Sequence, residues 1–247
     1  MNKEIPFVSS PSNPRVKELA GIKPGPNAFL VEGFHLVGMA SESKMLDEVY
    51  FSGESLPEGL SYCKATKTTY EIIKKLSLSK TPEPILGVCH YQKPRKTDLK
   101  RSVVLDRVQD PGNVGAILRS CLAFGFRDVF FLPGTCSPFN PKALASSQGG
   151  IFGLNLHFLP GEEDLLSLAK EKGISLFSTA LRDSLPLETF PFNKEERLAF
   201  IFGNEGKGVS ESLLSCSKAR LRIAMEGIES LNVSVAAGIL LYSVYAL

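Results

Sequence analysis

The chain has 247 residues, 43% of them hydrophobic and 22% charged, an ordinary globular composition that fits one large domain or two small ones. Its five cysteines form no C-x-x-C pair, and their odd number argues against a disulfide framework and a structural zinc site, so we expect a reducing, cytoplasmic environment. The first 14 residues contain no apolar core of signal-peptide length.

Positive charge is concentrated in the first part of the chain. Residues 1–101 carry 15 Lys and Arg against 11 Asp and Glu, a net charge of +4, whereas residues 102–247 carry 13 against 15, a net charge of −2. The excess favours an anionic partner for the first part, although ordinary solvated lysines would give the same count.

Residues 1–92 are predicted to form a small α/β domain. SSPSNPRVKELAGI indicates a capped helix, and NAFLVEGFHLVGMA indicates a strand that passes into a helix at Glu32-Gly33. DEVYFSG and ILGVCHY are predicted strands, and TYEIIKKLSLSKTPEP is a predicted helix stopped by Pro82 and Pro84. Residues 93–101 contain Pro94 and several basic residues without an apolar period, which indicates a linker.

From Ser102 onwards, apolar strands alternate with helices. The predicted strands are SVVLD, RDVFFLPG, GLNLHFL, ISLFSTAL, RLAFIFGN and LRIAM. The predicted helices are NVGAILRSCLAFG, PKALASSQGG, EDLLSLAKEKG, SESLLSCSKA and the C-terminal segment. Near-continuous apolar strands between helices predict a mostly parallel sheet that is covered on both faces.

The C-terminal segment from Val233 is almost entirely apolar or small. It is about 15 residues long, whereas a bilayer core needs about 20, so we expect a buried helix rather than a membrane span. A helix that is apolar all round must be enclosed, either in the core or against another subunit.

Ligands bind parallel sheets at the carboxyl ends of the strands, and three strand ends here carry unusual loops. The first is the turn Asp110-Pro111-Gly112-Asn113, where Asn113 is a predicted N-cap. Arg119 follows six positions later, and helical side chains lean towards the N-terminus, so its guanidinium is placed to return towards this loop. A capping Asn and a surface Arg would explain the same residues.

The second loop, FGNEGKGVSES, has glycines at 203, 206 and 208, and Ser210 is the predicted cap of the next helix. It fits neither a P-loop, which would need Gly at Ile201 and Ser or Thr at Gly208, nor the dinucleotide pattern. Glu205 is the one acid between Gly203 and Gly208, and such a residue is often simply solvated. The third loop, EGIES, leads to a helix opened by Ser230 or Asn232, which helix capping alone would explain.

Other chemistries fit poorly. The three histidines, His35, His90 and His157, have no metal-ligand spacing. The chain has no G-x-S-x-G elbow, and Cys121 lies inside an apolar helix, which indicates a structural thiol.

Taken together, DPGNVGAILRSCLAFG, FIFGNEGKGVS and RIAMEGIESLNVSVAAGILLY resemble the three motifs of the SpoU-type (TrmH-like) RNA ribose 2′-O-methyltransferases of the SPOUT superfamily, across residues 102–247. The first part resembles the substrate-binding domain that often precedes that fold, through SPSNPRVKEL, FLVEGFHLV and LSKTPEPILGV. It departs at Pro82-Glu83-Pro84-Ile85, where family members often have Pro-Gln-Gly-Ile.

The resemblance implies an α/β chain whose C-terminal SPOUT-type parallel-sheet domain, residues 102–247, contains a deep trefoil knot. It implies a small N-terminal α/β RNA substrate-binding domain in residues 1–92 and a basic linker in residues 93–101. The expected cofactor is S-adenosylmethionine, and the expected partners are RNA and a second copy of the chain, bound through the C-terminal helix. We expect rRNA as the substrate, with tRNA as the alternative, and neither DNA nor a membrane as a partner, because the 2′-hydroxyl distinguishes RNA from DNA.

The same resemblance implies the site residues and their roles. Arg119 would hold the phosphate and the ribose hydroxyl rather than act as a base, because a guanidinium has a pKa above about 12. The implied catalytic residues are Asn113, Arg119, Glu205, Ser230 and Asn232. The implied cofactor-binding residues are Gly203, Asn204, Gly206, Gly208, Ile223, Met225 and Leu231, and no metal ligand is implied.

Two other functions remain open from the residues. One is a catalytically silent RNA-binding or ribosome-assembly protein of the same fold, against which the intact site residues argue. The other is a nucleotide-binding α/β enzyme with another cofactor, against which the failed P-loop and dinucleotide patterns argue.

Overall fold

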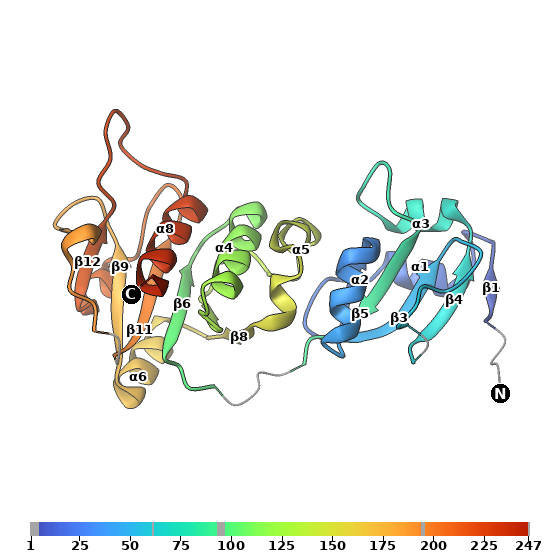
Figure 1. Cartoon of the computed structure of the whole chain (residues 1–247), viewed down its shortest axis with the longest axis horizontal. Helices are drawn as coiled ribbons and strands as arrows, with labels where there is room; N and C mark the ends of the chain where they lie inside the picture. Colours follow the sequence, from blue (N-terminus) through green and yellow to red (C-terminus); the bar gives the residue numbers. More distant parts are fainter. Residues whose placement is uncertain (1–4, 61, 93–96, 194–195, 247) are drawn as a thin grey trace.

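A computed structural model describes residues 5–60, 62–92, 97–193 and 196–246, which form two β-sheets with helices on both faces of each (Figure 1). The strands of the first sheet end at Cys89, and those of the second begin at Arg101. Of the predicted linker, residues 93–96 lie outside the described part. Its last residues are packed against the second sheet, since Leu99 is buried and the Thr97 hydroxyl bonds to Asp128.

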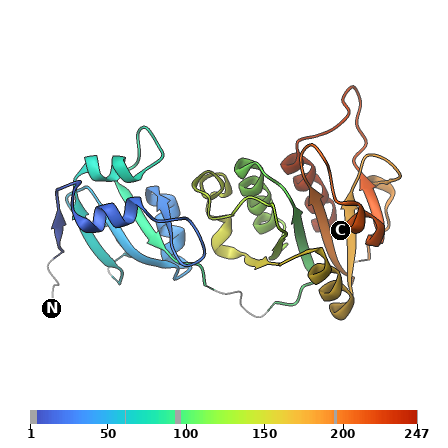
Figure 2. The same cartoon turned by 180° about the vertical axis from the view of Figure 1, so that it is seen from behind.

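The first sheet has the strand order β1-β4-β3-β5-β2, in which β1, β4 and β3 are parallel and β5 is antiparallel to both its neighbours. Helices α1 and α3 cover one face and α2 covers the other, as comparison of Figures 1 and 2 shows. The strands are β1 (Phe7–Val8), β2 (Phe29–Glu32), β3 (Leu46–Phe51), β4 (Lys64–Thr68) and β5 (Ile85–Cys89). The helices are α1 (Pro14–Ala20), α2 (Gly33–Glu42) and α3 (Tyr70–Leu76).

The first sheet departs from the sequence prediction in helix α3 and in two strands that were not predicted, the two-residue β1 and β4. Helix α3 ends at Leu76, well before Pro82, because Ser77 is extended and Glu32 accepts hydrogen bonds from the Ser77 hydroxyl and from the Leu78 N–H. The prolines therefore do not stop this helix. Strand β4 was not predicted because its sequence, KATKT, has too few apolar residues to show a strand pattern.

The second sheet has the strand order β10-β12-β9-β11-β6-β7-β8, and every pairing in it is parallel, as predicted. Helices α6 and α7 cover one face, and α4, α5 and α8 cover the other. The strands are β6 (Arg101–Asp106), β7 (Asp128–Phe131), β8 (Asn155–Phe158), β9 (Ile174–Thr179), β10 (Leu185–Pro186), β11 (Arg197–Gly203) and β12 (Ala219–Arg222). The helices are α4 (Pro111–Ala123), α5 (Pro141–Ser147), α6 (Glu162–Lys172), α7 (Glu211–Cys216) and α8 (Val233–Tyr245), with short 3-10 turns η1 (Gly150–Gly153) and η2 (Leu187–Thr189).

Strand β12 ends at Arg222, so the prediction that it runs to Met225 is wrong. Its neighbour β9 stops at Thr179, opposite Leu221, and the edge strand β10 pairs only as far as Arg222. With no partner beyond that point the ladder ends, and residues 223–225 become part of a loop.

Helix α8 is enclosed on one side only. It buries Ala237, Leu240, Leu241 and Val244 beneath it, where it packs on α4 and β11. Its other side leaves Val235, Ile239 and Tyr242 exposed, at the spacing of a single helix face. Within the described residues, none of the helices has both the length and the apolar character needed to cross a bilayer.

An apolar core joins the two sheets. The Phe29 ring of β2 lies 5.1 Å from the Phe139 ring and 6.4 Å from the Phe152 ring, centroid to centroid. The Tyr91 hydroxyl donates to the Leu154 carbonyl over 3.1 Å and accepts from the Leu156 N–H over 2.7 Å. The two sheets are thus joined by a shared apolar core and by hydrogen bonds.

Candidate active site

The predicted loops meet at the carboxyl ends of the strands, along the upper edge of the second sheet in Figure 1. Strands β6 and β11 are neighbours, and Gly203 at the end of β11 pairs with Asp106 at the end of β6. The long loop between β12 and α8 projects above the same edge. Segments that lie about 100 residues apart in the chain are thus side by side.

The first turn of α4 is capped by Asp110, so the prediction that Asn113 is the N-cap is wrong. The Asp110 carboxylate accepts from the Asn113 N–H over 3.0 Å, and its other oxygen lies 3.0 Å from the Lys142 ammonium. Pro111 occupies the first helical position, where a missing N–H costs nothing. The Asn113 side chain is therefore released from capping and is free to bond elsewhere.

Asn113 bonds to the other two loops at once. Its Nδ2 donates to Glu205 Oε1 over 3.0 Å, and its Oδ1 accepts from Asn232 Nδ2 over 2.9 Å. Asn232 caps α8, as predicted, because its Oδ1 accepts from the Ser234 N–H over 2.9 Å. One chain of hydrogen bonds therefore connects Glu205, Asn113 and Asn232, which come from the three predicted loops.

The Glu205 carboxylate is held as an acceptor. Besides the Asn113 amide, it accepts from the Gln109 N–H over 3.3 Å and the Asp110 N–H over 3.2 Å. Partial burial raises the pKa of the Glu205 carboxyl, but these hydrogen bonds outweigh it and hold the pKa below its usual range. A carboxylate this well supplied with donors is a weak base, which indicates an orienting role.

The glycine-rich loop is a tight turn closed on itself. The Asn204 and Gly208 backbones exchange two hydrogen bonds, of 3.1 Å and 2.8 Å. A Cβ on Gly203 would lie 2.2 Å from the Gly208 carbonyl carbon, so only glycine fits there. Gly208 has φ +70° and open space beside it. Asn204 is part of the turn itself, since its Oδ1 accepts from the Gly206 and Lys207 N–H groups.

A buried clasp that sequence reasoning missed ties this turn to β6. The buried Asp106 carboxylate accepts from the Ser210 N–H over 2.8 Å and from the Arg107 guanidinium over 2.8 Å and 2.9 Å. The Arg107 carbonyl accepts from Asn204 Nδ2 over 3.0 Å, and Arg107 itself has a φ of +59°. An aspartate at the end of the apolar run VVLD was the available signal, because a buried carboxylate needs such partners.

The remaining predicted residues lie around this network without joining it. Within the described residues, Arg119 and Ser230 are exposed, and their side chains make no hydrogen bond or ion pair. Six helical residues span about 600°, so Arg119 is rotated about 120° from Asn113 around the α4 axis. On the loop after β12, Ile223, Met225 and Leu231 are partly buried, and Ile223 packs against the main core.

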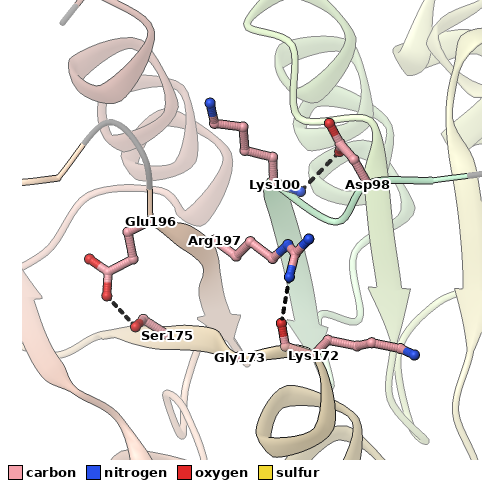
Figure 3. Close-up of a pocket in the computed structure, with 7 residues that line it drawn as sticks. All are labelled: Asp98, Lys100, Lys172, Gly173, Ser175, Glu196 and Arg197. Carbon is pink, nitrogen blue, oxygen red and sulfur yellow. Dashed lines mark hydrogen bonds between the residues drawn. The ribbon is translucent and has the colours of Figure 1, made fainter.

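A cavity of about 500 Å³ lies at the opposite end of the sheet, where β6, β9 and β11 begin. Its polar groups are already engaged with one another: the Arg197 guanidinium donates to the Lys172 carbonyl over 3.1 Å, and the Ser175 hydroxyl bonds to Glu196 (Figure 3). Parallel sheets bind ligands at the other end of their strands, so we place the site in the three loops.

The chain is similar in sequence to known RNA methyltransferases. The SpoU rRNA Methylase family model matches residues 100–242. The chain is 34% identical over 226 residues to the 23S rRNA (guanosine(2553)-2'-O)-methyltransferase RlmP of Bacillus subtilis, covering 87% of this chain and 88% of that protein. It is also 34% identical over 150 residues to the tRNA (guanosine(18)-2'-O)-methyltransferase of Thermus thermophilus, covering 60% of this chain and 74% of that one.

Among solved structures, an AdoMet-bound rRNA methyltransferase from Sinorhizobium meliloti superposes with a TM-score of 0.87 at 22% identity, covering 98% of both chains, which shows the same fold. The resemblance drawn from the three sequence motifs is confirmed by the family match, which spans all of them. The chain therefore belongs to the SpoU rRNA methylase family.

Proposed function

We propose that this protein is an S-adenosylmethionine-dependent methyltransferase that modifies ribose 2′-hydroxyls of ribosomal RNA. The observation that carries the proposal is the hydrogen-bonded chain Glu205–Asn113–Asn232, which unites the three loops at one edge of the sheet. The likeness to RlmP over most of both chains supports rRNA as the substrate class. The likeness to the tRNA enzyme of Thermus thermophilus, over a smaller part of this chain, makes tRNA the second candidate.

The two sheets belong to domains with different functions. Residues 1–92 form the RNA substrate-binding domain, residues 93–101 the basic linker and residues 102–247 the catalytic domain. A trefoil knot in the catalytic domain is supported by the strand order β12-β9-β11-β6, which takes the chain outward to β12 before it returns to α8 beside α4. The free cysteines support a reducing, cytoplasmic location. The 2′-hydroxyl requirement excludes DNA as a substrate.

The protein acts as a homodimer through α8. Val235, Ile239 and Tyr242 form an exposed apolar stripe on this helix, which is the surface that a second copy would cover. The Tyr242 ring packs against Phe124 at 5.6 Å between centroids, and the neighbouring Tyr245 ring does so at 5.7 Å, so the Tyr242 end of the stripe is supported.

The residues of the loops fit a bound S-adenosylmethionine. Gly208 has no side chain and open space beside it, so the backbone groups of the Gly203–Gly208 turn are accessible to a ligand there. Ile223, Met225 and Leu231, partly exposed on the loop after β12, supply apolar surface for an adenosine. When bound, this cofactor supplies an electrophilic methyl group on a sulfonium.

The protein's own residues orient the acceptor ribose. Glu205 fixes the Asn113 amide, and Asn232 fixes it from the opposite side, so the network is preorganised before RNA binds. Ser230, exposed and without a partner among the described residues, is available to hold the acceptor nucleotide. Arg119 is likewise available, and it holds the RNA phosphate and the ribose oxygen by charge-assisted hydrogen bonds.

The test is transfer of a tritium-labelled methyl group from S-adenosylmethionine to ribosomal RNA and, separately, to tRNA. We expect label in ribosomal RNA, recovered after nuclease digestion as a 2′-O-methyl nucleoside. Binding of S-adenosylmethionine without transfer to either RNA would support the catalytically silent alternative, and label on a base would contradict the proposal. Arg119→Lys tests whether Arg119 holds the RNA or acts as a base, because Lys is able to act as a base but cannot make the bidentate hydrogen bonds of a guanidinium.

A further inference from the structure

A groove lies between the two domains, at the carboxyl edge of the second sheet. It has a volume of about 370 Å³ and is lined by residues 24–26, which connect α1 to β2, by residues 131–139, which connect β7 to α5, and by residues 158–159 at the end of β8. Ligand sites occur preferentially at such domain interfaces. None of the described residues that line this interdomain groove is charged, and its walls are rich in proline and phenylalanine.

Phe158 is the exposed aromatic residue of this groove. The residue is 51% exposed, although its ring lies against two buried rings: Phe131 at 5.2 Å with an interplanar angle of 25°, and Phe139 at 6.1 Å. The buried rings support Phe158, and about half of the residue stays exposed where it lines the groove. A supported aromatic ring that remains half exposed offers a stacking surface to another planar group.

The interdomain groove shares a wall with the loop of the candidate active site. Thr135 Oγ1 accepts from the Arg107 N–H over 2.9 Å, and the Cys136 N–H donates to the Val108 carbonyl over 2.8 Å. An RNA strand that presents a ribose to Asn113 would therefore pass close to the groove with its neighbouring nucleotides. One cation lies nearby for a phosphate: Lys142, exposed on the first turn of α5, where its ammonium is 3.0 Å from the Asp110 carboxylate.

We propose that the interdomain groove holds one unpaired nucleobase of the substrate RNA, stacked on the ring of Phe158. An uncharged, aromatic and proline-rich groove fits a flat base better than a phosphate, and single-stranded RNA is commonly recognised by stacking splayed bases on aromatic side chains. This inference rests on the proposed function for its ligand, because it takes the RNA to be the methyl acceptor.

The chain contains no tryptophan, which makes a direct test possible. Phe158→Trp gives a protein with a single indole in the interdomain groove. Leu185→Trp is the matched control, because Leu185 is 53% exposed and lies on β10, the edge strand at the opposite side of the same sheet. Each variant is titrated with a short single-stranded oligoadenylate and with an abasic ribose-phosphate oligomer of the same length.

We expect oligoadenylate, and not the abasic oligomer, to quench the indole fluorescence of Phe158→Trp and to leave Leu185→Trp unchanged. No quenching, equal quenching by both oligomers, or equal quenching of both variants would overturn the proposal. A second measurement uses Phe158→Ala, which should raise the KM for ribosomal RNA about tenfold, the scale of one lost base–aromatic stack. The kcat and the KM for S-adenosylmethionine should not change, and an unchanged KM for RNA would refute the assignment.

Failure of this inference is distinguishable from failure of the proposed function. If the wild-type protein methylates ribosomal RNA while Phe158→Trp is not quenched, the proposed function stands and the stacking site is wrong. If the wild-type protein methylates no RNA, the proposed function fails, and the oligoadenylate titration still decides whether the groove takes a base.

Discussion

Replacing Asn113 by Asp tests the hydrogen-bonded network most sharply, because the two side chains have the same shape. The change turns the Nδ2 donor into a carboxylate oxygen 3.0 Å from Glu205 Oε1. Two like charges at that distance repel each other by about 1.4 kcal/mol even at the dielectric constant of water. The hydrogen bond to a charged acceptor, worth about 1.5 kcal/mol or less at an exposed position, is lost as well.

We therefore expect Asn113→Asp to lower the free energy of unfolding by about 2 kcal/mol, which corresponds to a fall in Tm of about 4–8 °C for a chain of this size. Differential scanning calorimetry measures the Tm, and isothermal calorimetry reports the affinity for S-adenosylmethionine in parallel. The matched control is Asn140→Asp at the N-cap of α5, where Asp caps a helix as well as Asn does, so no comparable loss is expected.

The double variant Asn113→Asp with Glu205→Gln decides the interpretation. It exchanges the charged and amide partners, so that the new glutamine amide is able to donate to the new carboxylate while its oxygen still accepts from the Gln109 N–H. The bond from the Asp110 N–H, which is made to the same Glu205 oxygen as the Asn113 bond, is lost in the double variant and in Glu205→Gln alike. We expect the double variant to be more stable than the sum of the two single changes allows, by about 1–2 kcal/mol. Additive effects, or an unchanged Tm in Asn113→Asp, would refute the network as drawn.

Three further predictions address the loop, the carboxylate and the helix. Gly203→Ala should abolish binding of S-adenosylmethionine measured by calorimetry, because the new Cβ would lie 2.2 Å from the Gly208 carbonyl carbon, whereas Gly238→Ala, whose nearest atom is at 3.8 Å, should not. Because folding lowers the pKa of Glu205, its carboxylate stabilises the fold at pH values above the ordinary glutamate pKa, and this stabilisation is lost as the pH falls through the folded-state pKa. The difference in the free energy of unfolding between the wild type and Glu205→Gln, measured by urea denaturation, should therefore shrink with acidification. Ile239→Arg places a charge on the exposed face of α8, and sedimentation velocity should then show a monomer.

Each of these three predictions has a contrary result. Normal cofactor binding by Gly203→Ala would mean that the turn tolerates a side chain. A stability difference that does not depend on pH would place Glu205 outside the network. A dimer that survives Ile239→Arg would show that α8 is not the interface.

The sequence predicted the parallel sheet well because its strands are buried on both faces. VVLD and FIFG are continuous apolar runs, and this pattern is unambiguous when helices follow at short distances. Strand β4 of the first sheet was not predicted, since KATKT alternates weakly and depends on its neighbours β1 and β3 for pairing.

The site shows what local rules miss. Asp110-Pro111 is itself a cap signal, with a capping carboxylate followed by Pro at the first helical position, yet Asn113 is also a good capping residue three positions later. The choice between them is made by Glu205 and Asn232, which lie 92 and 119 residues further on. Helix-end patterns use only neighbouring residues and therefore cannot predict such long-range contacts. The contacts of Asp106 with Arg107 and Ser210 were missed by the sequence analysis as well.

A crystal structure of the protein with S-adenosylmethionine tests the central claim most directly, namely that the three loops enclose one methyl donor beside Asn113. We predict that the donor lies against the Gly203–Gly208 turn and the loop after β12, with its methyl group directed towards the Asn113–Asn232 pair. A donor found in the cavity at the amino ends of β6, β9 and β11, or on any surface away from the three loops, would contradict the account.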